Sequence, residues 1–174
     1  MGNKRKLLGQ ISEIIEMVKS ELGGEIISGD AFSGSGIVSR LLKTKSKKLF
    51  VNDIAGYSET LNKCYLDTPS PIKIEQIKQY IDTVNNIAHN FSTNIDETKW
   101  ISRYWAPSGE ISKNDRVYFT QENGILIDRY RHLINQVPNE FRHYLLAQLI
   151  VKSSIHNNTN GQFSAFYKDE NGVG

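Results

Sequence analysis

The residue types best suited to ligand chemistry form one segment, Asp30 to Gly36, with the sequence DAFSGSG. Gly34 and Gly36 have no Cβ, so the backbone there can turn sharply and approach a ligand closely. The segment lies between a short apolar run, which predicts a strand, and apolar residues at helical spacing over Ile37–Leu42. Backbone N–H groups at the start of that helix would add donors. The pattern indicates a nucleotide-type binding loop at a strand-to-helix turn.

Two carboxylates flank this loop. Asp30 lies at the end of the strand predicted from Glu25 to Ser28, and Asp53 closes the next apolar run, which starts at Leu49. A carboxylate at the tip of the second strand is placed to accept hydrogen bonds from two ribose hydroxyls. The match to the dinucleotide fingerprint G-x-G-x-x-G is incomplete, because Ser39 occupies the third glycine position. The glycines form either an ordinary turn or a cofactor site, and the two carboxylates favour the cofactor site.

The elements that must position these residues follow an α/β order. Apolar residues recur at helical spacing over Leu7–Leu22, where Gly23 and Gly24 end the helix, and another helix is predicted over Gly56–Leu66. Strand, helix, strand and helix in succession are typical of α/β proteins. Lys43–Lys48 contains four lysines in six residues, which form either a solvated connection or a phosphate-contacting patch.

The rest of the chain is predicted to be mainly helical. A long helix follows the prolines at 69 and 71, and its apolar stripe consists of Ile74, Ile77, Ile81, Val84, Ala88 and Phe91. Residues 120–137 form either a helix capped by Thr120 or a hairpin turning at Asn123-Gly124. The helix is favoured, because apolar residues recur at helical spacing over a segment longer than a short strand. Pro138 then starts a helix whose expected buried face consists of Phe141, Leu145, Leu149 and Ile155.

Composition bounds the class of protein. The 174 residues, 39% hydrophobic and 23% charged, fit one soluble globular domain, and a net charge of +2 leaves the partner open. The single Cys64 forms no intrachain disulfide, and the four histidines lack zinc-site spacing. No run of about 18 apolar residues predicts a membrane span. We expect a reducing, cytoplasmic setting, no metal and no membrane partner.

Five segments together resemble the D12-class, or Dam-like, adenine-N6 DNA methyltransferases, which use S-adenosylmethionine. Residues 2–8 (GNKRKLL) resemble the family's N-terminal cofactor motif, residues 30–36 its D/E-x-F-x-G-x-G loop, and Asn52-Asp53 its second acidic motif. Residues 118–123 (YFTQEN) and 158–163 (NTNGQF) are similar to later segments of some members. The likeness spans nearly the whole chain.

The resemblance implies an α/β, partial Rossmann-like methyltransferase fold with a mainly helical insertion. It also implies a set of S-adenosylmethionine-binding residues: Gly2, Asn3, Lys4, Asp30, Phe32, Ser33, Gly34, Gly36 and Asp53. Lys4 would contact the methionine end of the cofactor, Asp53 the ribose, and Asp30 the amino-acid portion. Three plainer interpretations stay open: Lys4 as a solvated terminal lysine, Asp53 as a strand cap, and Phe32 as core packing.

One family motif is missing. The catalytic signature, Asp or Asn followed by two prolines and an aromatic residue, is absent, because no two of the four prolines are adjacent. We therefore expect residues 1–174 to form one incomplete methyltransferase domain. Residues 1–68 would bind cofactor, residues 69–156 would be a possible DNA-recognition insertion, and residues 157–174 would be a loop leading towards a missing catalytic strand. Truncation, a split gene and degradation all fit.

The implied partners are double-stranded DNA and a separate catalytic polypeptide or the missing C-terminal part. Arg103, Tyr104 and Arg116 are the candidate DNA contacts, because arginine pairs with phosphate or guanine and aromatic faces stack on bases. Routine solvation of arginine on helix surfaces is the alternative. Two other functions stay open: a non-catalytic DNA-binding or specificity subunit, and a nicotinamide-dependent dehydrogenase suggested by the glycines and Asp53.

Overall fold

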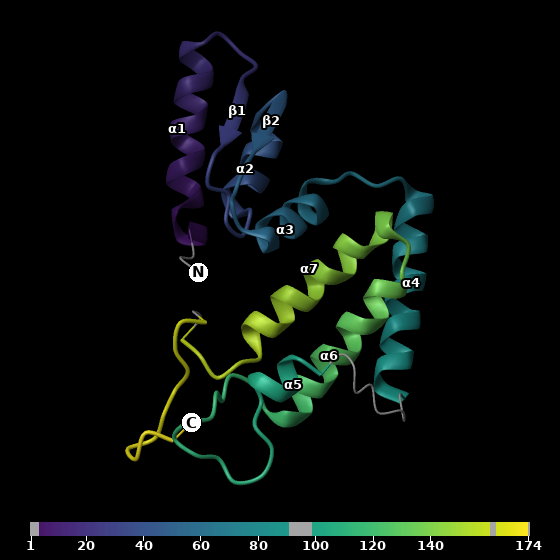
Figure 1. Ribbon diagram of the computed structural model, residues 1–174. Helices are drawn as coiled ribbons and strands as arrows, with labels where there is room; N and C mark the ends of the chain where they lie inside the picture. Colours follow the sequence, from purple (N-terminus) through teal and green to yellow (C-terminus); the bar gives the residue numbers. More distant parts are fainter. Residues whose placement is uncertain (1–3, 91–98, 161–162, 174) are drawn as a thin grey trace. The chain divides into compact units, whose positions relative to one another are not determined.

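The structure, a computed structural model, describes residues 4–90, 99–160 and 163–173. The chain divides into two compact units, Met1–Thr68 and Pro69–Gly174 (Figure 1). Within the described ranges, every helix is too short or too polar to cross a membrane.

The first unit is built around a β-α-β motif. Its elements in chain order are η1 (Lys4–Leu7), α1 (Leu8–Glu21), β1 (Ile27–Asp30), α2 (Ile37–Lys45), β2 (Lys48–Val51) and α3 (Gly56–Leu66). The two strands pair in parallel, with Ile27 opposite Lys48 and Asp30 opposite Val51. Helix α2 packs against both strands and against α1 and α3. The predicted alternation of strands and helices is confirmed, and β1 begins two residues later than expected.

The lysine-rich connection between α2 and β2 is held by contacts within the unit. Lys43 Nζ donates to the carbonyl of Leu66 at 2.8 Å and to Thr68 Oγ1 at 2.9 Å. Lys45 Nζ lies 2.6 Å from a carboxylate oxygen of Glu16. These lysines therefore connect the last turn of α2 to the body of α1 and to the end of α3.

Apolar surface is left open on the first unit. Both strands show the same burial pattern, in which their first and third residues are exposed, including Ile27 and Phe50. Helix α1 buries only Ile15 of its stripe, whereas Ile14 and Leu22 are exposed. The stripe is present as predicted, but Leu7 and Val18 are exposed as well, and α1 packs mainly on η1 and α2. Parallel sheets are normally covered on both faces.

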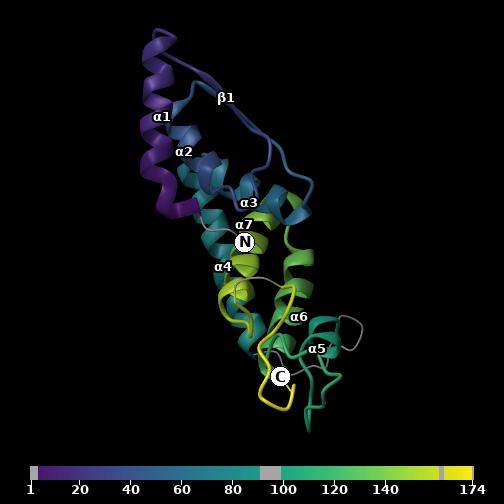
Figure 2. The same ribbon diagram turned by 90° about the vertical axis from the view of Figure 1, so that its left-hand side faces the viewer.

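The second unit is helical. It contains α4 (Pro71–Asn90), α5 (Ile101–Tyr104), α6 (Gln121–Gln136) and α7 (Asn139–Ile155), and α6 packs against the other three (Figures 1 and 2). The core where α4, α6 and α7 meet consists of Val84, Ala88, Leu133, Ile134, Phe141, Tyr144, Leu145 and Ala147. The expected burial of Ile155 is wrong: it is exposed at the last position of α7, where the helix ends. Phe91 lies outside the described residues.

The segment 120–137 is a helix and not a hairpin. Thr120 caps α6, since its Oγ1 accepts a hydrogen bond from the backbone N–H of Asn123 at 3.2 Å. Gly124 lets α5 approach α6 closely, because a Cβ at this position would lie 3.0 Å from Cα of Ser102 in α5 and 2.6 Å from Cβ of Ala106, which follows α5. The Asn-Gly pair therefore serves helix packing in place of a turn.

Candidate functional site

The glycine loop joins β1 to α2 and requires its two glycines. Gly34 and Gly36 have φ angles of +52° and +74°, in the left-handed region that other residues rarely adopt. Gly36 also precedes α2 directly and is buried, and a Cβ there would lie 2.5 Å from Oδ1 of Asn62. A side chain at residue 36 would therefore strain the backbone and force Asn62 to move.

Asp53 ties the loop to the end of β2. Its Oδ2 accepts from the backbone N–H of Gly34 at 2.7 Å, and its Oδ1 accepts from the backbone N–H of Ala55 at 2.9 Å. These bonds, from Ala55 first and then Gly34, lower the pKa of the Asp53 carboxyl below its usual 3.8. Asp53 is therefore ionised at neutral pH and lies at the loop, as a ligand-binding carboxylate must.

Asp30 is the last residue of β1, and its side chain is half-buried beside the loop. Its Oδ2 accepts from Ser39 Oγ at 2.6 Å, and Ser39 is fully buried in α2. Among the described residues, Ser39 is the one hydrogen-bond partner of this carboxylate. Ser39 is thus more than a departure from the glycine fingerprint, because its hydroxyl orients Asp30.

Asn62 of α3 supports the loop through a side-chain hydrogen bond, and the sequence motifs do not include this residue. Its Nδ2 donates to Ser33 Oγ at 2.8 Å, and both side chains are buried. The contact spans 29 residues of chain, so no local motif contains it. One signal was available: Ser58, Leu61 and Asn62 share the helical spacing of a buried face, and two of the three are polar.

Two large apolar side chains are exposed where the loop meets the end of β2. Phe32 is 85% exposed, so the interpretation of Phe32 as core packing is wrong. Ile54, which the sequence analysis did not single out, is also fully exposed and follows Asp53 directly. The hydrogen bond from Gly34 to Asp53 joins the two segments that carry them. A flat apolar ligand group would find contact surface there.

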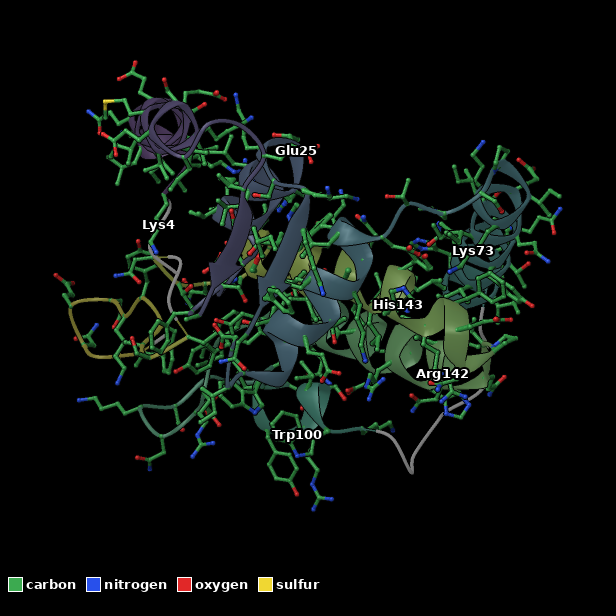
Figure 3. All side chains as sticks on the ribbon, turned by 90° about the horizontal axis from the view of Figure 1, so that it is seen from above. Lys4, Glu25, Lys73, Trp100, Arg142 and His143 are labelled. Atoms are coloured by element: carbon green, nitrogen blue, oxygen red, sulfur yellow. The ribbon has the colours of Figure 1, made fainter. Side chains whose placement is uncertain are left out.

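Lys4 lies at the start of η1 and is exposed (Figure 3). The short helix η1 packs against α2, at the end of the first unit where both strands finish (Figure 1). Gly2 and Asn3 lie outside the described residues. The structure thus brings Lys4 to the same end of the unit as the glycine loop.

Several backbone N–H groups of the loop already donate hydrogen bonds to other groups of the protein. The N–H of Ser33 donates to the carbonyl of Asn52 at 3.1 Å, and that of Gly36 donates to the carbonyl of Ser33 at 2.8 Å. The N–H of Gly34 is bound to Asp53. A phosphate site needs such N–H groups to point at the ligand. With three of them engaged and two carboxylates nearby, the loop suits a cationic or hydroxyl-rich ligand better than a phosphate.

The candidate DNA contacts lie on and near α5 in the second unit. Arg103 lies over the ring of Tyr104 at 5.3 Å, and Arg116 lies over the ring of Trp105 at 5.8 Å. Tyr104 and both arginines are exposed, and Trp100 projects away from the ribbon (Figure 3). The structure therefore gathers Arg103, Tyr104 and Arg116 around two tryptophans, as basic groups paired with aromatic rings.

A polar pocket adjoins this surface. It has a volume of about 500 Å³, and its lining consists of Lys99, Ser102, Arg103, Ala106, Pro107, Ser108 and Gln121. Asp128 of α6 fixes the start of α5 beside it, since its carboxylate accepts from the backbone N–H groups of Ile101 at 3.0 Å and Ser102 at 2.9 Å. The short helix is thus held by a buried side chain of its neighbour.

The geometry describes a β-α-β unit with a carboxylate-flanked glycine loop, joined to a helical unit with a basic aromatic surface. The chain belongs to the D12 class N6 adenine-specific DNA methyltransferase family, which matches residues 1–172. This confirms the family resemblance of the sequence.

Three relatives match 97% of the chain. They are the type II methyltransferase M.NlaIII of Neisseria lactamica, 28% identical, the modification methylase LlaI of Lactococcus lactis subsp. lactis, 27% identical, and the type II methyltransferase M.FokI of Planomicrobium okeanokoites, 30% identical. The matched region covers 49%, 27% and 26% of their respective lengths, so the chain spans half of these relatives or less. No solved structure matches the chain significantly.

Proposed function

We propose that this chain is the S-adenosylmethionine-binding part, with a DNA-recognition part, of a site-specific adenine-N6 DNA methyltransferase. The observation that carries the proposal is the pair of carboxylates at the glycine loop. Asp53 is held in the ionised form by two backbone N–H groups, and Asp30 is oriented by Ser39. S-adenosylmethionine carries a sulfonium, an ammonium and two ribose hydroxyls, all of which a carboxylate can attract or bind.

The remaining groups at the loop complement the other parts of that cofactor. Phe32 and Ile54 offer exposed apolar surface for the adenine ring, and Lys4 offers a cation for the cofactor's carboxylate. Gly2 and Asn3 belong to the same proposed set by family resemblance, as do the backbone groups of Ser33, Gly34 and Gly36. The β-α-β motif is compatible with a partial Rossmann-like methyltransferase fold.

A nicotinamide-dependent dehydrogenase fits less well. A dinucleotide needs loop N–H groups for its pyrophosphate, and the loop uses three of these groups for internal hydrogen bonds. Isothermal titration of the chain against S-adenosylmethionine and NADH separates the two functions. We expect saturable binding of S-adenosylmethionine. Binding of NADH without S-adenosylmethionine would overturn the proposal.

The reaction itself requires residues that this sequence lacks. The exocyclic amine of adenine becomes nucleophilic when an amide or carboxylate and a backbone carbonyl accept its hydrogen bonds, and an aromatic residue stacks on the flipped base. No Asp/Asn-Pro-Pro-aromatic motif is present in residues 1–174. We propose that methyl transfer needs a further catalytic segment, either in a separate polypeptide or in a C-terminal continuation, and that this chain alone is inactive.

A second candidate is a non-catalytic DNA-binding or specificity subunit. The exposed apolar side chains of the first unit, which include Ile27 and Phe50 on the strands and Ile14 on α1, favour assembly with another polypeptide. Co-purification with a partner that carries the catalytic motif, without any binding of S-adenosylmethionine by this chain, would favour this candidate. Binding of the cofactor by the chain itself favours the first.

A further inference from the structure

We propose that Ser39 is a positioning residue, which holds Asp30 for the ammonium group of the ligand's α-amino acid portion. This inference rests on the proposed function and adds a specific role for a side chain that the glycine fingerprint does not contain. Ser39 stands where the fingerprint has its third glycine or alanine.

The two carboxylate oxygens of Asp30 differ in their hydrogen bonding. Ser39 Oγ donates to Oδ2 at 2.6 Å, which is a short bond of the charge-assisted kind. This bond restrains rotation of the carboxylate and leaves Oδ1 with its acceptor capacity. Asp30 is half-buried, so solvent and a ligand can reach it. An ammonium group carries three donors and no acceptor, and it therefore complements an oriented carboxylate oxygen.

Packing alone does not require the hydroxyl. Ser39 is fully buried at the third position of α2, where the fingerprint residue serves close helix-to-strand packing and has no polar side chain. Alanine would fill nearly the same space. A buried hydroxyl needs a hydrogen-bond partner, and this one is satisfied by Asp30. The hydroxyl is therefore matched to the carboxylate.

Asp53 provides the contrast. Both of its oxygens already accept backbone N–H groups, from Gly34 and Ala55, so its orientation is fixed by the loop itself. The orientation of the Asp30 carboxylate is instead fixed by the hydrogen bond from Ser39. Loss of the Ser39 hydroxyl should thus weaken recognition of the amino-acid portion and leave recognition of the nucleoside intact.

Isothermal titration with two ligands tests this difference. S-adenosylhomocysteine contains the amino-acid portion, and 5′-methylthioadenosine contains the same nucleoside without it. We expect Ser39→Ala to weaken binding of S-adenosylhomocysteine about tenfold, the scale of one hydrogen bond to a charged group, and to change binding of 5′-methylthioadenosine less than about twofold.

Two further variants complete the experiment. Ser28→Ala is a matched control, because it removes another 2.6 Å serine hydrogen bond of the same unit, to Ser46, and it should leave both affinities unchanged. Ser39→Gly also removes the hydroxyl and should give the same selective loss, which keeps the test valid if Ser39→Ala fails to fold.

The outcomes are distinct. An equal loss for both ligands, or no loss for either, overturns the role of Ser39 while leaving the proposed function standing. Failure of the unmodified chain to bind S-adenosylhomocysteine overturns the proposed function and the role of Ser39 together.

Discussion

Gly36 is the residue on which the glycine loop depends most closely. Gly34→Ala should destabilise the first unit by about 1–2 kcal/mol, because the residue has a left-handed φ of +52° but open space around it. Gly36→Ala combines the same backbone strain with a contact of 2.5 Å to Asn62, so it should destabilise the unit more. Hydrogen exchange of peptides covering residues 27–45 measures both effects. Equal protection in the two variants would contradict the steric argument.

Asp53 should make the first unit sensitive to acid. Its pKa is lowered on folding by the N–H groups of Ala55 and Gly34, so its contribution to stability is present above its usual pKa of 3.8 and is lost as the pH falls through the lowered folded value. Asp53→Asn should be less stable at pH 7 and should lose less further stability on acidification. Hydrogen exchange of the same peptides at pH 7 and pH 3 measures this, after correction for intrinsic rates.

The acid effect can be assigned to Asp53 by comparison. Glu16 and Glu59 also have lowered pKa values, from hydrogen bonds to Lys45 and Lys63, and they contribute equally to both proteins. An unchanged dependence on pH in Asp53→Asn would contradict the role of this carboxylate in holding the loop.

At the level of single residues, sequence reasoning found the groups that lie in the loop motif and missed those that support it. Asp30 ends β1, Gly34 and Gly36 lie in the loop after it, and Asp53 lies just beyond β2, so the sequence pattern predicted their places. Asn62 belongs to α3 and donates a hydrogen bond to Ser33 in the loop. Its role depends on the packing of α3 against the loop, which the sequence pattern does not give.

Helix α5 has four residues, too few to be stable alone, so its position depends on α6. Asp128 is buried and accepts three hydrogen bonds at the start of α5, from the N–H groups of Ile101 and Ser102 and from Ser102 Oγ. Asp128→Ala should lower the free energy of unfolding of the second unit by about 2–3 kcal/mol, since it leaves these donors unpaired.

Tryptophan fluorescence during denaturant unfolding measures this change, because both tryptophans of the chain, Trp100 and Trp105, flank α5. Asp128→Asn keeps an acceptor oxygen, so its free energy of unfolding should lie between those of Asp128→Ala and the unmodified chain. A stability of Asp128→Ala equal to that of the unmodified chain would contradict the capping role.

Helices with long apolar repeats could be predicted from the sequence, but the sequence did not predict which of their apolar residues are buried. The helix over 121–136 followed from spacing that outlasts a strand, with Thr120 as its cap. The stripe of α1 was also readable, but spacing does not say whether a partner covers it, and Ile14 and Leu22 are exposed. The parallel pairing of β1 and β2 agrees with the helix that connects them.

Across the whole molecule, positive charge on and near α5 should govern DNA affinity. Arg103→Gln and Arg116→Gln should each weaken binding to duplex DNA and reduce the slope of log affinity against log salt by roughly one, the value for one phosphate contact. Lys78→Gln is the matched control, because this exposed lysine of α4 in the same unit is paired with Glu75. Fluorescence anisotropy over a salt series measures all three. No binding of the unmodified chain at low salt, or an equal slope change in the control, would contradict the recognition surface.

The family was identifiable from the sequence, because the motifs that resemble it occur in the family's order along the chain. The match over residues 1–172 confirms that identification. The arrangement of Arg103 and Arg116 over neighbouring rings was not readable, since it depends on the packing of α5 against α6 and on the buried Tyr118 and Phe119.

The central claim is that the carboxylate-flanked glycine loop binds S-adenosylmethionine. Its most direct test is an NMR titration of the ¹⁵N-labelled chain with S-adenosylhomocysteine, which is chemically stable and retains the nucleoside and the amino-acid portion. We predict saturable shifts of the backbone amide signals of Gly34, Gly36, Ser39 and Ile54, with the amides of α6 unchanged. Shifts confined to the second unit, or none at saturating ligand, would contradict the claim.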